Sequence, residues 1–215
     1  MRYKLVLFDL DGTLIDTIED LGDAVNHALA KRGLPLHTTA EYRHKVGHGI
    51  RNLVWQSLPE NLRGDDALVD ECLADFKAWY SAHIDVHTRP YEGMQDLLQT
   101  LYNQGVKLAV ASNKFQEGTE RLIREFFPGV EFAAILGNRE GYPLKPDPAI
   151  VREVLDAAGV KADEAVLVGD SPTDMKTAVN GGIKGIAVNW GYRSAGELAG
   201  NDLACSVAEL SAMLA

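Results

Sequence analysis

Five short, wholly apolar runs constrain the fold of this chain more than any other feature. The runs are residues 5–8, 108–111, 132–136, 165–168 and 186–188. A strand buried on both faces carries such a run, and helical patterns separate the runs from residue 88 onward. Short buried strands joined by helical crossovers form a parallel sheet. The sequence therefore predicts an α/β fold in which helices cover both faces of a parallel sheet.

The segments between these runs have the spacing of amphipathic helices. Apolar stripes predict helices at residues 94–101, 122–127, 147–158 and 171–181. In the third of these, Asp147 is expected to be the N-cap and Pro148 to stand in the first turn. Gly105, Gly159 and Gly181-Gly182 are expected to end the first, third and fourth helices.

Residues 16–87 interrupt the alternation and read as a helical insert. An apolar stripe from Ile18 to Leu29 predicts one helix, Thr38 with Glu41 resembles a capping box, and a further helix is expected at 66–83. No strand is predicted there. We therefore expect a sheet domain made of residues 1–15 and 88–215, with an all-helical domain of residues 16–87 inserted after the first strand.

Charge and composition exclude several classes of function. The net charge of the 215-residue chain is −10, which disfavours non-specific binding of nucleic acid. Cys72 and Cys205 suggest neither a disulfide framework nor a zinc site. No apolar run is long enough to span a membrane, and the chain enters its first strand within a few residues, without a signal peptide. The expected location is the cytoplasm.

Two carboxylates follow the first apolar run directly. Asp9 and Asp11 stand two apart, with Gly12 after them, at the strand edge where ligands bind in open α/β sheets. Side chains at this spacing on a strand project the same way and repel each other when both are charged. A divalent cation is the simplest group that offsets the repulsion. The alternative is an ordinary Asp-Gly turn.

Polar residues also follow the other predicted strands. Each has a structural alternative when taken alone: a helix cap for Ser112 or Asn113, a solvated loop position for Lys145, and a turn or a capping box for Asp170 and Asp174. Those alternatives do not explain why all of these residues reach the same edge of a parallel sheet.

A set of this composition is suited to phosphoryl transfer, which depends mainly on positioning and on neutralising charge. Asp9 and Asp170 would hold the cation, while Lys145 and Ser112 would hold phosphate oxygens. Asp9 would attack phosphorus, because carboxylates can form aspartyl-phosphates. Asp11 would protonate the leaving alkoxide and then deprotonate water.

Together these residues resemble the four motifs of the haloacid dehalogenase-like hydrolase superfamily, over nearly the whole chain. The motifs read Asp9-x-Asp11-Gly12-Thr13, Ser112-Asn113, Lys145-Pro146 and Gly169-Asp170-Ser171-Pro172-Thr173-Asp174. The resemblance implies a Rossmann-like core, Mg²⁺, Asp9 as nucleophile and Asp11 as general acid/base. It also implies that Asp9, the Asp11 backbone carbonyl and Asp170 ligate the metal, with Asp174 nearby, and that the helical insert is a small cap domain.

Within the superfamily, the chain is most similar to the phosphoglycolate phosphatases. Residues 45–51 and 189–192 carry that similarity. Members that act as dehalogenases lack a carboxylate matching Asp11, so its presence favours phosphotransfer. The expected activity is Mg²⁺-dependent hydrolysis of a small phosphorylated metabolite, best guessed as 2-phosphoglycolate or a similar phosphomonoester, by a monomer or a homodimer.

Substrate contacts are expected from both parts of the chain. Thr13 and Asn113 are assigned to substrate binding, and Lys45, His48 or Arg51 is expected to meet a substrate carboxylate. The alternative for the last three is a solvated basic helix face. Trp190 and Tyr192 are expected to pack the sheet edge rather than touch the substrate.

Other activities remain open at this point. A hexose-phosphate phosphomutase or a pyrophosphatase would share the same core. A phosphonate hydrolase would need a cap lysine that forms an imine, and neither Lys31 nor Lys45 is distinctive. A catalytically silent phosphate-binding regulatory module is the alternative from another class, and the intact Asp9 and Asp11 argue against it.

Overall fold

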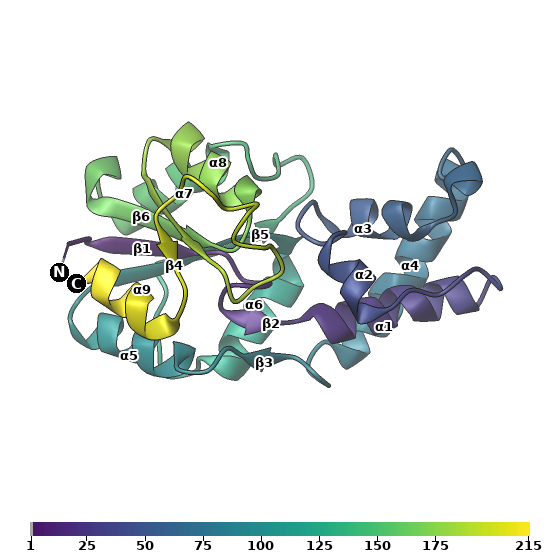
Figure 1. Ribbon diagram of the computed structural model, residues 1–215, viewed down its shortest axis with the longest axis horizontal. Helices are drawn as coiled ribbons and strands as arrows, with labels where there is room; N and C mark the ends of the chain where they lie inside the picture. The colour runs from purple at the N-terminus through teal and green to yellow at the C-terminus, as the bar shows by residue number, and fades with distance from the viewer. Residues whose placement is uncertain (1) are drawn as a thin grey trace.

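The structure is a computed structural model that describes residues 2–215. Its main sheet has six strands in the order β5-β4-β1-β6-β7-β8, and every neighbouring pair is parallel (Figure 1). The fold class predicted from the sequence is confirmed. The strands are β1 (Leu5–Phe8), β4 (Lys107–Phe115), β5 (Ala134–Asn138), β6 (Ala165–Gly169), β7 (Lys184–Val188) and β8 (Leu203–Ala204).

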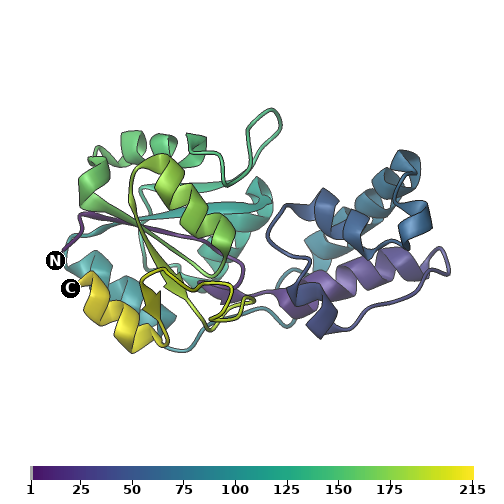
Figure 2. The same ribbon diagram turned by 45° about the horizontal axis from the view of Figure 1, so that its top comes forward.

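Helices cover both faces of this sheet because successive strand residues point to opposite sides. Leu5 and Leu7 of β1 pack with α7 (Ala149–Ala158) and α8 (Pro172–Gly181). Val6 and Phe8 face the other side, where α5 (Met94–Asn103), α6 (Gln116–Phe126) and α9 (Val207–Leu214) lie. Figure 2 shows the two helical layers with the sheet between them. A short 3₁₀ turn, Ala162–Glu164, precedes β6.

Several predicted boundaries differ in the structure: β4 continues to Phe115 rather than ending at 111, and α6 begins at Gln116 rather than at 122. The third strand lies at Ala134–Asn138 rather than at 132–136. The prediction that Asp147 is the N-cap of α7 is wrong by one residue, since Pro148 occupies that position. Asp147 Oδ1 accepts the N–H of Ala149 at 2.9 Å, so the aspartate forms the turn before the helix instead.

The helical insert lies beside one end of the sheet (Figure 1). Its elements are α1 (Ile18–Ala30), α2 (Thr39–Arg43), α3 (Ile50–Ser57), the 3₁₀ turn Glu60–Leu62 and α4 (Asp66–His83). The capping box of Thr38 and Glu41 is confirmed. Arg32 Nη1 pairs with Asp75 Oδ2 at 2.6 Å and so ties the end of α1 to α4. The sequence did not predict α3.

A small antiparallel pair joins the two connections between insert and sheet. In it β2 (Ile15–Asp16) pairs with β3 (Arg89–Pro90), which the sequence did not predict. The pair lies at both boundaries of the expected division into residues 1–15 with 88–215 and residues 16–87; that division into domains stays a prediction. Within residues 2–215, none of the helices combines the length and apolarity that crossing a membrane requires.

Candidate active site

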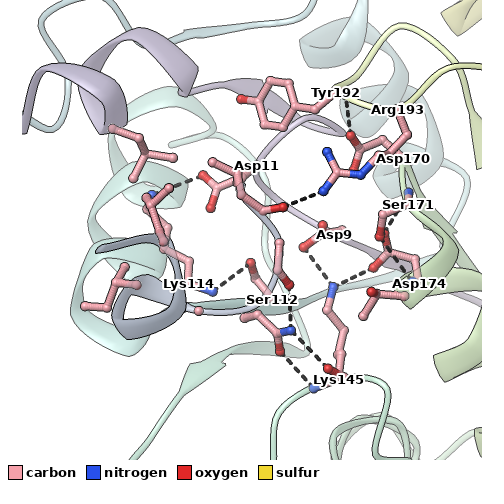
Figure 3. Close-up of a pocket in the computed structure, with 18 residues that line it drawn as sticks. Asp9, Asp11, Ser112, Lys114, Lys145, Asp170, Ser171, Asp174, Tyr192 and Arg193 are labelled. Atoms are coloured by element: carbon pink, nitrogen blue, oxygen red, sulfur yellow. Dashed lines mark hydrogen bonds and ion pairs between the residues drawn. The ribbon is translucent and has the colours of Figure 1, made fainter. Parts of the chain in front are cut away.

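Seven of the residues assigned from sequence line one pocket between the sheet edge and the insert (Figure 3). The strand ends supply them because the carboxyl ends of parallel strands share one edge. The helical insert covers this pocket with Leu21, Val46, Ile50 and Leu53. The seven predicted residues are Asp9, Asp11, Ser112, Asn113, Lys145, Asp170 and Asp174.

Asp9 is held at the centre of this edge by the sheet itself. Its backbone N–H donates to Val168 O at 2.9 Å, so the residue continues the pairing of β1 with β6. The chain then turns at Gly12, whose φ is +86°. A Cβ at Gly12 would overlap Asp170 Oδ2, so only glycine permits this approach between the two acidic loops.

Lys145 lies between two of the carboxylates, as Figure 3 shows. Its Nζ is 2.9 Å from Asp9 Oδ1 and 2.6 Å from Asp174 Oδ1, and it also donates to Ala111 O at 2.7 Å. Burial alone would lower the pKa of Lys145. The charges of Asp174 and Asp9 outweigh burial and raise that pKa above its ordinary value, so the amine stays cationic.

Three carboxylates form a cluster with room for a cation. One oxygen from each of Asp9, Asp170 and Asp174 lies within 4.8 Å of the others. Burial, then the charges of Asp174 and Asp11, raise the pKa of Asp9 to about 6, although Lys145 lowers it. Burial and the charges of Asp174 and Asp9 also raise the pKa of Asp170. Asp9 Oδ1 accepts no hydrogen bond from residues 2–215, its one cationic contact being Lys145. A divalent cation fits this excess of negative charge.

Asp11 is fixed through a single oxygen. Thr17 Oγ1 donates to Asp11 Oδ1 at 2.7 Å, and Lys114 Nζ donates to the same oxygen at 3.0 Å. Sequence reasoning missed Lys114, whose side chain is only 1% exposed. Its one sequence signal was its place directly after Ser112 and Asn113 at the end of a buried strand.

Asn113 links the strand end to the two neighbouring loops. Its Oδ1 accepts the N–H of Lys145 at 2.8 Å, and its Nδ2 donates to Lys145 O at 3.1 Å and to Gly47 O at 2.9 Å. The amide therefore fixes the backbone beside the Lys145 amine and contacts the turn between α2 and α3. Ser112 Oγ accepts the N–H of Lys114 at 3.2 Å.

The loop after β7 supplies two pocket residues that the sequence did not assign. Tyr192 N donates to Asp170 Oδ2 at 2.6 Å, and its Oη accepts the N–H of Thr17 at 2.8 Å. Tyr192 thus lines the pocket, beyond the sheet-edge packing expected for it. Arg193 donates to the carbonyl oxygens of Arg43 and Val46, so it ties the segment between α2 and α3 to the loop after β7.

Four residues assigned to substrate binding do not line the pocket. Thr13 is fully buried, and its backbone oxygen accepts from Trp190 Nε1. Arg51 pairs with Asp66 and Asp70, each at 3.0 Å. His48 is exposed, and Lys45 Nζ lies 5.4 Å from the ring centre of Tyr42. The structure thus brings the core motifs together and leaves the three basic insert residues outside.

Known proteins match the chain along most of its length. The family model of the haloacid dehalogenase-like hydrolases matches residues 6–188. A Mesorhizobium japonicum protein named phosphoglycolate phosphatase is 38% identical over 89% of this chain and 85% of its own. One of the same name from Pseudomonas syringae pv. tomato is 34% identical over 98% of this chain and 78% of its own.

Solved structures agree. A crystal structure from Lactobacillus delbrueckii subsp. bulgaricus, provisionally named a phosphoglycolate phosphatase, is 33% identical and has a TM-score of 0.93 over 100% of this chain and 99% of its own. CbbY from Rhodobacter sphaeroides, solved with xylulose-1,5-bisphosphate, is 26% identical and has a TM-score of 0.79 over 97% of this chain and 96% of its own.

The chain therefore belongs to the haloacid dehalogenase-like hydrolases. Within that family it is an enzyme of the phosphatase type. The resemblance seen in the sequence motifs is confirmed.

Proposed function

We propose that the enzyme hydrolyses a small phosphorylated metabolite, 2-phosphoglycolate or a similar phosphomonoester, through an aspartyl-phosphate on Asp9. The observation that carries this proposal is the meeting of Asp9, Lys145, Asp170 and Asp174 in one pocket with the Asp11 carboxylate. The named relatives support phosphoglycolate as the substrate.

In the first step, a carboxylate oxygen of Asp9 attacks phosphorus, and the bond from phosphorus to the ester oxygen breaks. Asp11 gives its proton to the departing oxygen, so the product leaves as an alcohol. In the second step, Asp11 takes a proton from water, and that water attacks phosphorus and frees Asp9. Lys145 and Ser112 hold the phosphate oxygens throughout, and the Lys145 cation offsets part of the phosphate charge.

Asp9, Asp170 and Asp174 are the residues that would hold Mg²⁺, together with the backbone carbonyl of Asp11. The excess of carboxylates around Asp9 Oδ1 supports this assignment. When bound, the cation would neutralise charge on the phosphate and on the acidic cluster. Asp174 also accepts from Ser171 N at 3.1 Å and from Ser171 Oγ at 2.5 Å, which orients its carboxylate toward Lys145.

We propose a small molecule as the substrate because the insert covers the pocket at the sheet edge. Val46, Ile50 and Leu53 form an apolar cover, and the cations that line the pocket are Lys114, Lys145 and Arg193. The assignment of Lys45, His48 or Arg51 to the substrate carboxylate stays a prediction. We further propose that the enzyme acts in the cytoplasm, as a monomer or a homodimer, without nucleic acid or a membrane.

The test is a panel of phosphate esters assayed with and without Mg²⁺. We expect turnover of p-nitrophenyl phosphate and a higher kcat/KM for 2-phosphoglycolate than for glucose 1-phosphate or pyrophosphate. Asp9→Asn should lower kcat/KM at least about 10³-fold, because the amide is a poor nucleophile. Asp96→Asn, an exposed change on α5, is the control. Equal rates for wild type and Asp9→Asn would refute the mechanism, and a preference for glucose 1-phosphate would refute the substrate.

A further inference from the structure

Lys114 is a buried lysine to which the mechanism above gives no role. Its side chain is 1% exposed, and its Nζ donates to Asp11 Oδ1 at 3.0 Å and to Tyr80 Oη at 2.6 Å. A buried ammonium is costly unless it is paired and hydrogen-bonded. These two acceptors therefore determine where the ammonium lies.

The two acceptors belong to different parts of the molecule. Asp11 follows β1 at the sheet edge, whereas Tyr80 belongs to α4 of the insert. Tyr80 is fully buried, its ring stacking on Phe76 at 5.2 Å between centroids and meeting the edge of Phe115 at 6.0 Å. This packing fixes the position of the Tyr80 hydroxyl within the insert. Lys114 connects that hydroxyl to the Asp11 carboxylate.

The hydrogen bonds at Asp11 are unequal between its two oxygens. Thr17 and Lys114 both donate to Oδ1, and within residues 2–215 no donor bonds to Oδ2. Asp11 lines the pocket, so Oδ2 is the oxygen left to exchange a proton with the substrate. A carboxylate anchored through one oxygen has its other oxygen fixed in direction, which is what efficient proton transfer requires.

We propose that Lys114 is a positioning residue that sets the Oδ2 atom of Asp11 only when Tyr80 of the insert is in place. The inference rests on the proposed function, because it gives Asp11 a proton to transfer. It adds that closing the insert over the sheet edge also orients the Asp11 carboxylate, because the Lys114 ammonium bonds to both parts of the molecule. Without the Tyr80 hydroxyl, Lys114 keeps its ion pair with Asp11 but loses the contact that fixes its own place.

The test compares two generic esters that differ in how much they need a general acid. Phenyl phosphate has a poor leaving group, which needs protonation, and p-nitrophenyl phosphate has a good one, which does not. The parameter is kcat/KM, since it reports the steps up to departure of the leaving group. Lys114→Met should lower kcat/KM for phenyl phosphate by about 10²-fold and for p-nitrophenyl phosphate by about tenfold or less.

Tyr80→Phe removes the hydroxyl and keeps the buried ring. We expect a smaller loss of kcat/KM, about three- to tenfold for phenyl phosphate, and again less for p-nitrophenyl phosphate. In the double variant, Tyr80→Phe should add nothing to Lys114→Met, because the residues act through one connection. Tyr42→Phe is the matched control. Tyr42 is also fully buried in the insert, but its hydroxyl donates to Asn26 Oδ1, away from Lys114.

Equal losses on the two esters would overturn the proposal, and so would independent, multiplicative effects of the two substitutions. If Lys114→Met does not fold, Tyr80→Phe alone decides, by showing or lacking the bias between esters. The aryl esters are not the natural substrate. A wrong assignment of 2-phosphoglycolate would therefore leave this result unchanged, and the panel of natural esters would reveal that error separately.

Discussion

Asp20 adds a second link between the two connections of sheet and insert, which the β2–β3 pair also joins. It lies in the first turn of α1 and is 3% exposed. Its carboxylate accepts the N–H of His87 at 2.9 Å, and the N–H and Oγ1–H of Thr88 at 2.9 and 2.7 Å. One charged side chain thus satisfies three donors from the returning connection.

The cost of removing this carboxylate follows from those contacts. Asp20→Ala leaves two donors of the fully buried Thr88 without an acceptor, and each such donor costs about 1–3 kcal/mol. We expect a loss of about 3–4 kcal/mol in the free energy of unfolding. Asp20→Asn keeps one acceptor oxygen and should lose about 1–2 kcal/mol. Thr88→Val removes only the hydroxyl and should lose about 1 kcal/mol.

Urea unfolding, with slopes compared between variants, measures these losses. Asp23→Ala is the control: its side chain is one turn further along α1, is 58% exposed and has only a 3.9 Å contact with His87. We expect it to stay within about 0.5 kcal/mol of wild type. If Asp20→Ala were no more costly than Asp23→Ala, the account of the connection would be refuted.

Two further predictions concern the surface of the sheet domain and the cover of the pocket. Arg139 holds the pKa of Glu153 down to about 2 from its ordinary 4.5, chiefly by hydrogen bonding. The pair therefore stabilises the fold above about pH 4.5, and its contribution is lost as pH falls toward 2. Glu153→Gln should lower the free energy of unfolding by about 1 kcal/mol or less at pH 7, because both side chains are about one-third exposed. Near pH 2 the variant should match wild type. Unfolding measured across this pH range tests the prediction, and a constant difference between the two proteins would contradict it. Arg193→Ala should speed amide hydrogen exchange in residues 44–49, because it frees the carbonyls of Arg43 and Val46, and should leave α4 unchanged. Unchanged exchange in residues 44–49 would show that Arg193 does not hold that turn.

Sequence predicted five of the six strands of the main sheet, because strands buried on both faces leave a local signal, and it missed β8, an edge strand of two residues. Leu5 to Phe8 and Ala165 to Val168 are apolar without interruption, and such a run can be recognised without knowing which strands pair with it. The pair β2–β3 had no such signal. Each strand has two residues, and pairing Ile15 with Pro90 depends on contacts between residues far apart in the chain.

The pocket residues also fall into those with a local sequence signal and those without one. The sequence could place Asp9, Lys145 and Asp170 at one edge of the sheet because each follows a strand or lies in a loop whose end the topology fixes, and all three line the pocket. Lys114 was missed because its contacts are with Tyr80 and Asp11, at sequence separations of 34 and 103 residues. Tyr80 itself lies on the apolar stripe of α4, so its sequence position indicates only packing.

For the basic residues of the insert, the sequence left two interpretations open. Lys45, His48 and Arg51 lie close together in the chain, which is compatible with a contact to a substrate carboxylate and with a solvated basic helix face. The structure gives Arg51 two acids of α4, Asp66 and Asp70, and turns His48 toward solvent. Local clustering of charge does not reveal where each side chain points, and that direction decides which of them can meet a ligand.

The two surfaces of the pocket differ in how freely they can be rebuilt. The side chains of its floor share hydrogen-bond partners: Lys145 pairs with both Asp9 and Asp174, and Tyr192 bonds to both Asp170 and Thr17. Its apolar cover is held by packing against the core and by the backbone carbonyl of Val46, which accepts from Arg193, so changing the side chains of the cover leaves that hydrogen bond in place. A directed-evolution library meant to change which ester is accepted should therefore randomise Val46, Ile50 and Leu53, and leave the floor untouched.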